Sequence, residues 1–129
     1  MGIVSIIVAA VAAWVFGAVW YGLIGRQWMA ASGLTEETVN RSNPAPYIVS
    51  FVCTILVAGM TAHIMRSGGV HGAWNGIVTG IGLGAFIALP WQATNVMFSQ
   101  RPRELIWMDG AYTVVGCTII GLVLGLWPA

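Results

Sequence analysis

The sequence predicts an all-α, polytopic membrane protein, in which four transmembrane helices form a single domain over residues 1–129 with a short interfacial helix in the first loop. Two observations predict it. Of the 129 residues, 58% are hydrophobic and only 7% are charged, and the mean hydropathy is +0.85. This composition is more apolar than a soluble domain of this size can bury in one core. The apolar residues also gather into four stretches, each near the ~20 residues that a helix needs to cross hydrocarbon.

The four predicted spans cover about residues 2–25, 47–65, 72–95 and 105–127. A helix is the economical way to cross a bilayer because all its backbone polar groups find partners within the segment. The links between the spans are unequal, since the first has about twenty residues and the other two have fewer than ten. Short links predict antiparallel neighbours for the second, third and fourth spans.

The long first link contains the signal for the interfacial helix. Thr35 is followed by Glu36 and Glu37. A hydroxyl at the cap and acids in the first turn both favour a helix N-terminus. We expect this helix to end by Asn43, where prolines interrupt the chain before the second span.

The arginines predict the orientation. Arg66 is the one arginine in the second link, whereas the first and third links hold Arg26, Arg41, Arg101 and Arg103. By the positive-inside rule, both chain termini lie outside the cytoplasm. The expected location is therefore the cell (inner) membrane, with several passes through the bilayer.

A row of glycines runs along the third span at every fourth residue, comprising Gly72, Gly76, Gly80 and Gly84. Residues four apart lie on one helix face, so the row predicts a helix contact close enough for the backbones to touch. Small residues on the first span (Ala9, Ala13, Gly17) and on the fourth (Gly121, Gly125) offer a matching face within the monomer. A homo-oligomer interface is the alternative.

Pro90 and Asp109 are the two unusual residues at membrane depth. Pro90 cannot donate to the carbonyl of Phe86, so a kink or local unwinding is expected late in the third span. Asp109 is the one acid inside a span, and intramembrane ionisable residues are candidates for function. The structural alternative is an ion pair between Asp109 and a nearby arginine. Tyr112, one turn further on, is placed to hydrogen-bond to Asp109 or to Asn95.

Other functional classes find little support. The net charge is +1 and lysine is absent, which argues against a nucleic-acid partner. His63 and His71 are too isolated to form a metal site, and Cys53 and Cys117 lie in apolar runs as packing residues. We therefore expect no metal and no cofactor, and no Ser–His–Asp set or phosphate-binding loop points to conventional catalysis.

Several motifs together resemble a family of bacterial membrane proteins catalogued as domain of unknown function 1761. The residues that carry the resemblance are Gly17-Ala18-Val19-Trp20-Tyr21-Gly22 with Gly25 and Trp28, Leu34-Thr35-Glu36-Glu37, Thr94-Asn95-Val96-Met97-Phe98 with Arg101-Pro102, and Asp109 with Tyr112. The resemblance implies a four-helix membrane protein and supplies no established activity. Where the family usually shows histidine after the tyrosine, this chain has Thr113.

All these motifs fall at the predicted cytoplasmic face. The predicted polar site there consists of Asp109, Tyr112, Asn95, Gln92, Arg101, Trp20, Tyr21 and Trp28. Such a cluster is either a binding site or the polar seal of the bundle.

Three functions follow as hypotheses. The first is a non-enzymatic accessory or scaffolding bundle that associates with itself or with a larger membrane complex through small-residue faces. The second is a small transporter or channel with a polar site near Asp109 and Asn95, beside the Pro90 kink. The third is an enzyme that acts on a lipid or quinone at the interface, which would need a nucleophile and base that the sequence does not display.

Overall fold

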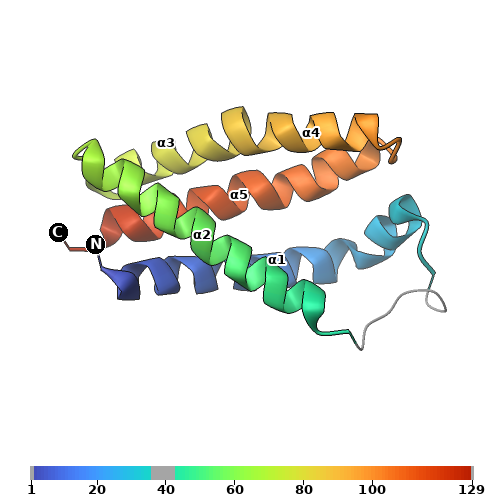
Figure 1. Ribbon diagram of the computed structural model, residues 1–129, viewed down its shortest axis with the longest axis horizontal. Helices are drawn as coiled ribbons and strands as arrows, with labels where there is room; N and C mark the ends of the chain where they lie inside the picture. The colour runs from blue at the N-terminus through green and yellow to red at the C-terminus, as the bar shows by residue number, and fades with distance from the viewer. Residues whose placement is uncertain (1, 36–42, 129) are drawn as a thin grey trace.

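The computed structural model describes residues 2–35 and 43–128, and every regular element in these two ranges is a helix. In chain order the elements are α1 (Ile3–Ser32), α2 (Ala45–Ser67), α3 (Ala73–Leu83), η1 (Gly84–Ala88), α4 (Leu89–Phe98) and α5 (Glu104–Leu126), as Figure 1 shows. Because α3, η1 and α4 form one continuous rod, the described residues contain four helices long and apolar enough to cross a membrane. The predicted fold class, an all-α bundle of four membrane-length helices, is confirmed.

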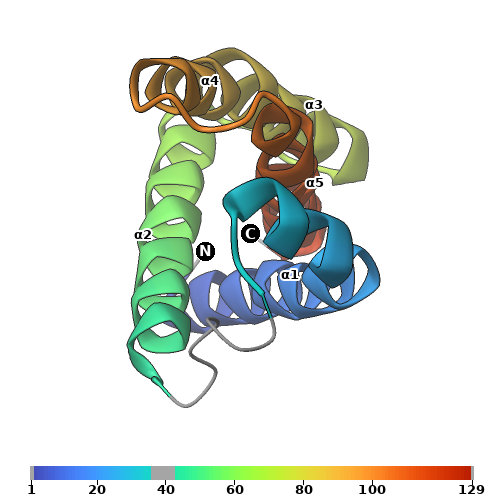
Figure 2. The same ribbon diagram turned by 90° about the vertical axis from the view of Figure 1, so that its right-hand side faces the viewer.

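The chain passes up and down the bundle, so the two termini lie near each other at one end (Figure 1). We call the opposite end, where α1 and α4 finish and α2 and α5 begin, the Asp109 end. Figure 2 views the bundle from this end, with α5 between α1 and the α3–α4 rod. The central position of α5 explains why it is the helix that holds the others together.

Helix α1 continues beyond the predicted span. It was expected to leave the bilayer near Gly25, but its 30 residues run to Ser32. The helix ends at Gly33, whose φ of 75° is left-handed and suits a residue without a side chain, and the Leu34 amide closes the end by donating to the Met29 carbonyl. The predicted interfacial helix falls mainly on residues 36–42, which lie outside the described residues.

The α3–α4 rod changes its geometry directly before Pro90. Gly84–Ala88 form one π-helical turn, η1, and Pro90 lies in the first turn of α4. Proline removes the amide hydrogen that the Phe86 carbonyl would accept, and a wider turn is one way to accommodate that loss. The local departure from α-helical geometry expected near Pro90 is therefore present, as a π turn.

Glycines of α3 and α5 bring the two backbones into contact. A Cβ atom added to Gly76 would collide with the carbonyl oxygen of Gly121, and one added to Gly121 would collide with that of Gly76. The row continues in both directions, since Gly80 lies against Cys117 and Gly72 lies against Gly125. The Gly72 amide also donates to the Gly125 carbonyl at 3.0 Å, with Gly72 at a φ of 91°. Most of the glycine face of the third span is thus covered by the fourth span of the same chain.

The main core lies where α1, α2 and α5 meet, and it is built largely from small side chains. Its buried members are Ala9, Ala10, Ala13, Ala58, Ala62, Met65, Ile120 and Leu124. A second, smaller cluster at the Asp109 end contains Val96, Leu105 and Met108, with Trp28 packed against it. This second cluster joins α4 and α5 to the C-terminal half of α1.

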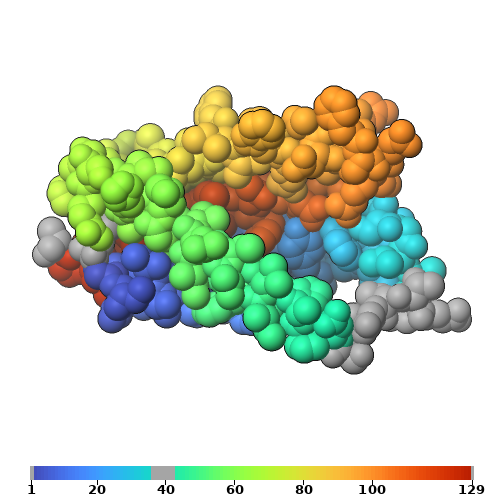
Figure 3. Space-filling view, in the orientation of Figure 1, coloured from blue at the N-terminus to red at the C-terminus, as the bar shows by residue number. Residues whose placement is uncertain are grey.

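The bundle is open on one side. Helix α2 runs obliquely along α1, meets α3 only near their short link, and makes no close backbone contact with the described residues of η1 or α4. Figure 3 shows this gap, with α5 visible between α2 and the α3–α4 rod. The short link 66–71 therefore makes α2 and α3 neighbours at one end only.

Candidate functional site

A carboxylate on α5 is held by two aromatic side chains of α1. Tyr21 and Trp28 are seven residues apart, which places them two turns apart on one face. The Tyr21 hydroxyl donates to Oδ1 of Asp109 at 2.5 Å, and Trp28 Nε1 donates to the same oxygen at 3.0 Å. All three side chains are half-buried. We call Tyr21, Trp28 and Asp109 the aromatic–carboxylate cluster.

The cluster gives the half-buried carboxylate two neutral hydrogen-bond donors. A carboxylate placed in hydrocarbon without partners is strongly unfavourable, whereas hydrogen bonds from neutral donors offset part of its lost hydration. The Tyr21 and Trp28 rings also meet nearly edge-on, with centroids 6.0 Å apart and planes at 80°. The positions of the Tyr21 and Trp28 rings are therefore fixed both by their contact with each other and by their hydrogen bonds to Asp109.

Trp20 adds a third hydrogen bond between the same helices. Its Nε1 donates to the main-chain carbonyl of Met108 at 2.8 Å. Adjacent residues of α1 thus bind adjacent residues of α5, since Trp20 pairs with Met108 and Tyr21 with Asp109. The result is a fixed register between α1 and the first turns of α5.

Tyr112 occupies the space that Gly17 leaves on α1. A Cβ atom added to Gly17 would come within 2.6 Å of the Tyr112 ring, so the ring lies directly on the backbone of α1. Its centroid is 5.6 Å from that of Tyr21 and 6.2 Å from that of Phe16. Within residues 2–35 and 43–128 the Tyr112 hydroxyl has no hydrogen-bond partner, so it bonds to neither Asp109 nor Asn95.

Gln92 connects α4 to the site through Thr113. The Thr113 hydroxyl oxygen lies 2.8 Å from the Gln92 side chain and 2.9 Å from the main-chain carbonyl of Asp109. A hydroxyl has one proton to donate. Gln92 presents its side-chain carbonyl oxygen, so both neighbours of the hydroxyl are acceptors, and its proton is used in one of these two bonds. The polar contacts therefore link α1, α4 and α5 around one turn of α5.

Two predicted site residues lie elsewhere. Asn95 and Arg101 are exposed, and no hydrogen bond or ion pair joins either side chain to the aromatic–carboxylate cluster in the described part of the chain. The π turn explains Asn95. It adds one residue to the rod and so rotates the following helix by about 100°. Val96, which is 3% exposed, takes the inward position that uninterrupted α-helical spacing would give to Asn95.

The arginines do not pair with Asp109 in the described residues. Arg101 and Arg103 lie in the exposed link before α5, and Arg26 is exposed on α1. A guanidinium keeps its hydration at an exposed position, whereas the carboxylate has already gained neutral donors in the bundle. The ion pair considered from the sequence is therefore replaced by hydrogen bonds to aromatic side chains.

Sequence reasoning did not assign Thr113 or Phe16 to the site. Thr113 follows Asp109 by four residues and so lies on the same face of α5, which is a signal that helical spacing alone carries. Phe16 precedes Trp20 by four residues, and their rings stack with centroids 6.4 Å apart. Both residues extend the site toward the middle of the bundle.

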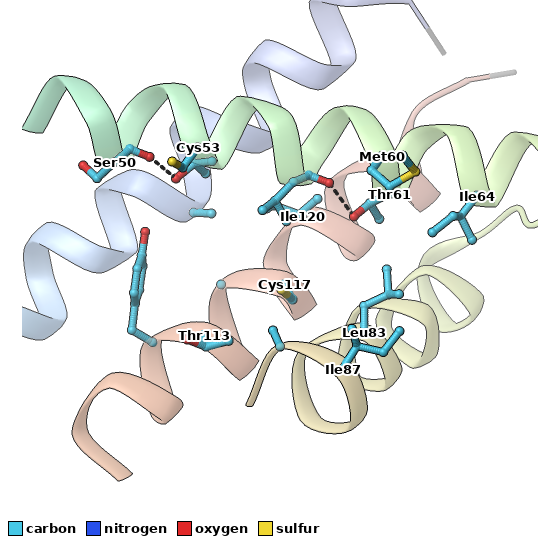
Figure 4. A pocket seen from close by; sticks show the side chains of 16 residues that line it. Ser50, Cys53, Met60, Thr61, Ile64, Leu83, Ile87, Thr113, Cys117 and Ile120 are labelled. Atoms are coloured by element: carbon cyan, nitrogen blue, oxygen red, sulfur yellow. Dashed lines mark hydrogen bonds between the residues drawn. The ribbon is translucent and has the colours of Figure 1, made fainter. Parts of the chain in front are cut away.

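A cavity of about 430 Å³ lies beside the site, on the open side of the bundle. Figure 4 shows side chains of α2, α5 and the α3–α4 rod around it. Tyr112, Thr113 and Ser50 line it toward the Asp109 end, whereas Ile64 and Ile120 line it toward the other end. The cavity thus begins next to the polar contacts and continues along an apolar wall.

Metal-ligating side chains do not gather anywhere in residues 2–35 and 43–128. No three His, Cys, Asp or Glu side chains lie together there. Cys53 and Cys117 are both free thiols.

Four membrane-length helices with a hydrogen-bonded carboxylate between them define a multi-pass membrane protein with a polar site inside the bundle. Residues 4–125 match the family described as "Protein of unknown function (DUF1761)". The chain belongs to this family, and the resemblance inferred from its motifs is confirmed. Comparison with curated proteins and with solved structures gave no match.

Proposed function

We propose that this multi-pass protein is a non-enzymatic accessory or scaffolding bundle of the cell membrane, which associates with a second copy or with a larger membrane complex. In the proposed orientation both termini lie outside the cytoplasm and the Asp109 end faces it. The distribution of Arg26, Arg101 and Arg103, all near that end, supports this orientation. The surface for association is not the glycine row, because α5 covers that face within the chain.

One observation carries the proposal, namely the large side chains on the uncovered face of the α3–α4 rod. Ile87, Trp91 and Phe98 are 56%, 69% and 86% exposed, and their spacing of four and seven residues places them on one face. We call these three residues the α4 stripe. A hollow of about 260 Å³ lies between Phe86 and Trp91, next to Pro90. Large rings beside a hollow are typical of surfaces that receive a partner's side chain.

The test is the mass of the protein purified in mild detergent. The wild-type protein should run as a dimer or with a larger partner, and Trp91→Ala should shift it toward the monomer because Trp91 forms a wall of the hollow. Leu23→Ala is the matched control, since Leu23 is 74% exposed on α1, a helix that makes no close backbone contact with the described residues of η1 or α4. A wild-type protein that is strictly monomeric and retains no partner contradicts the proposal.

A small transporter or channel is the second candidate, and a specific observation favours it. The half-buried Asp109 carries its carboxylate on the same turn of α5 whose main-chain carbonyl bonds to Thr113, and Thr113 contacts Gln92 of the rod just beyond its π turn. Interrupted helices beside polar groups are typical of transport sites. Asn95 is not included in this site because it is exposed.

The transport candidate is tested with protein reconstituted into liposomes that contain a pH-sensitive dye. A proton-coupled carrier requires a titratable group, so Asp109→Asn should abolish proton movement while Asn95→Ala leaves it unchanged. Equal proton movement in the wild type and in Asp109→Asn would exclude the proton-coupled version.

A further inference from the structure

We propose that the cavity on the open side of the bundle binds a neutral, single-chain amphiphile whose head group carries a carbonyl oxygen. The chain of this molecule lies along α2, and its head lies against Tyr112. The cavity shares Ile87 with the α4 stripe, whereas Trp91 and Phe98 lie outside its lining. The test below uses residues outside the stripe, so the proposal does not depend on the association proposed above.

The shape of the cavity fits one long chain. It extends along α2 from Ser50 to Ile64, which is about 21 Å of helix. Its volume of about 430 Å³ lies within the range of sites that bind small molecules. Because the cavity follows α2, an extended chain in it lies along the helices, and the cavity's length is about two thirds of the ~30 Å hydrocarbon core. Figure 4 shows Met60, Ile64 and Leu83 at the apolar part of the wall.

The polar end of the cavity offers one free hydrogen-bond donor. Thr54 donates to the Ser50 carbonyl at 2.7 Å, and Ser50 donates to the Tyr47 carbonyl at 2.9 Å, so both protons are used within α2. The Thr113 proton is used on the Gln92 side-chain oxygen or on the Asp109 carbonyl. Tyr112 lines the same end, and its hydroxyl has no partner in the described residues. A donor without a partner next to an apolar cavity is best satisfied by an acceptor oxygen on the bound molecule.

The charges around the cavity favour a neutral head group. None of the described residues that line the cavity is charged. Among the described acids, Asp109 lies close to the lining, because Tyr21 bonds to its carboxylate and also contacts Tyr112. An anionic head group would therefore lie near a carboxylate without an arginine to compensate, which is unfavourable at low dielectric.

The open side of the bundle provides the way in. Because α2 makes no close backbone contact with the described residues of η1 or α4, a chain can enter sideways from the bilayer. Two sources share the required chemistry, an acylglycerol-type lipid and a quinone with an apolar tail. Both carry a carbonyl oxygen next to a long chain, so the experiment uses one probe of each kind.

Cys53 is a built-in reporter, since it lines the cavity and its thiol is free and exposed. In a Cys117→Ala background, the rate at which Cys53 reacts with a maleimide is measured in detergent. Monoolein, or a fully substituted decyl-benzoquinone, should slow this reaction at least tenfold, and oleate should not. Slowing by monoolein alone assigns the site to a lipid, slowing by the quinone alone assigns it to a quinone, and slowing by both shows that the shared carbonyl is recognised.

Two variants test the assignment. Tyr112→Phe removes only the hydroxyl and should raise the concentration needed for protection about tenfold. Tyr47→Phe is the matched control, because Tyr47 is exposed outside the cavity lining, and should change nothing. Gly116→Val should abolish protection by filling the cavity, since a Cβ atom there meets only the Tyr112 ring at 3.7 Å.

Three results would overturn the proposal. The first is equal protection by oleate and monoolein, which would remove the role of the neutral head group. The second is an unchanged protection curve for Tyr112→Phe. The third is a Cys53 that is unreactive before any amphiphile is added and becomes reactive on dilution to the monomer, which would assign the groove to a second copy of the chain.

Discussion

Helix α5 meets its two main neighbours by opposite means. Along α3, glycines on both helices remove the side chains, so that backbone lies on backbone at Gly76 and Gly121. Along α1, at the Asp109 end, the contact consists of large rings and hydrogen bonds from Trp20, Tyr21 and Trp28. The α3–α5 contact is close because glycine has no side chain, whereas the α1–α5 contact depends on hydrogen-bond donors of α1 that point at acceptors of α5.

The difference teaches what each interface tolerates. In lipid the hydrophobic effect contributes little to helix association. The α3–α5 contact therefore depends on close van der Waals approach and is sensitive to any added atom. The α1–α5 contact depends on donors meeting an acceptor, so it is sensitive to lost polarity more than to size. Substitutions that change only side-chain size should therefore weaken the α3–α5 contact more, and substitutions that change only polarity should weaken the α1–α5 contact more.

The largest effect is expected at the glycine contact. Gly76→Ala places a methyl group on the backbone of Gly121, which cannot rotate away, and should lower the free energy of unfolding by about 3 kcal/mol. The measurement is an SDS titration followed by helical circular dichroism. Gly82→Ala is the control on the same helix, because no atom lies within 4 Å of its added Cβ. Equal stability of the two variants would show that the helices can separate freely.

An intermediate effect is expected when the acceptor of the aromatic–carboxylate cluster is removed. Asp109→Leu leaves the Tyr21 hydroxyl and the Trp28 indole without their acceptor, and should destabilise the protein by about 2 kcal/mol in the same titration. Asp109→Asn keeps an oxygen at the acceptor position and should lose less than half of that. Equal free energies of unfolding for Asp109→Leu and Asp109→Asn would show that the α1–α5 contact does not depend on the polarity of residue 109.

The smallest effect is expected at Gly17, where the two kinds of contact meet. Gly17→Ala is a change of size, but its neighbour is the Tyr112 ring, a side chain that can move. The loss of unfolding free energy should be about 1 kcal/mol, well below that at Gly76. Gly22→Ala, with open space around its added Cβ, should cause no loss. An equal loss of unfolding free energy for Gly17→Ala and Gly76→Ala would mean that the Tyr112 ring cannot move away from the added methyl group.

Hydropathy and spacing were sufficient to predict the four membrane-length helices, because each apolar stretch has the length of a crossing. The motifs also included Tyr21 and Trp28 with Asp109 in one predicted polar site, and in the structure both aromatic residues bond to that carboxylate. These features depend on local periodicity, which a sequence displays directly.

Features that depend on a change of periodicity were not predictable. Pro90 indicated a local disturbance, but not whether it would be a kink or an added residue in the turn. That choice decides whether Asn95 or Val96 faces α5. The partner of Asp109 was likewise undetermined, because arginines and aromatic donors both lie at its end of the bundle, and only the packing decides which of them reaches the carboxylate.

The length of α1 has a consequence for the bilayer around it. A helix of 30 residues spans about 45 Å, which exceeds the hydrocarbon thickness of ordinary membranes. The apolar stretch that ends at Gly25 accounts for about 35 Å of this length, so the turns that begin with Arg26 and Gln27 continue beyond the hydrocarbon. A small excess of apolar length is relieved by tilting. Because Trp20, Tyr21 and Trp28 bind α1 to α5, we expect the two helices to tilt in the bilayer as a pair.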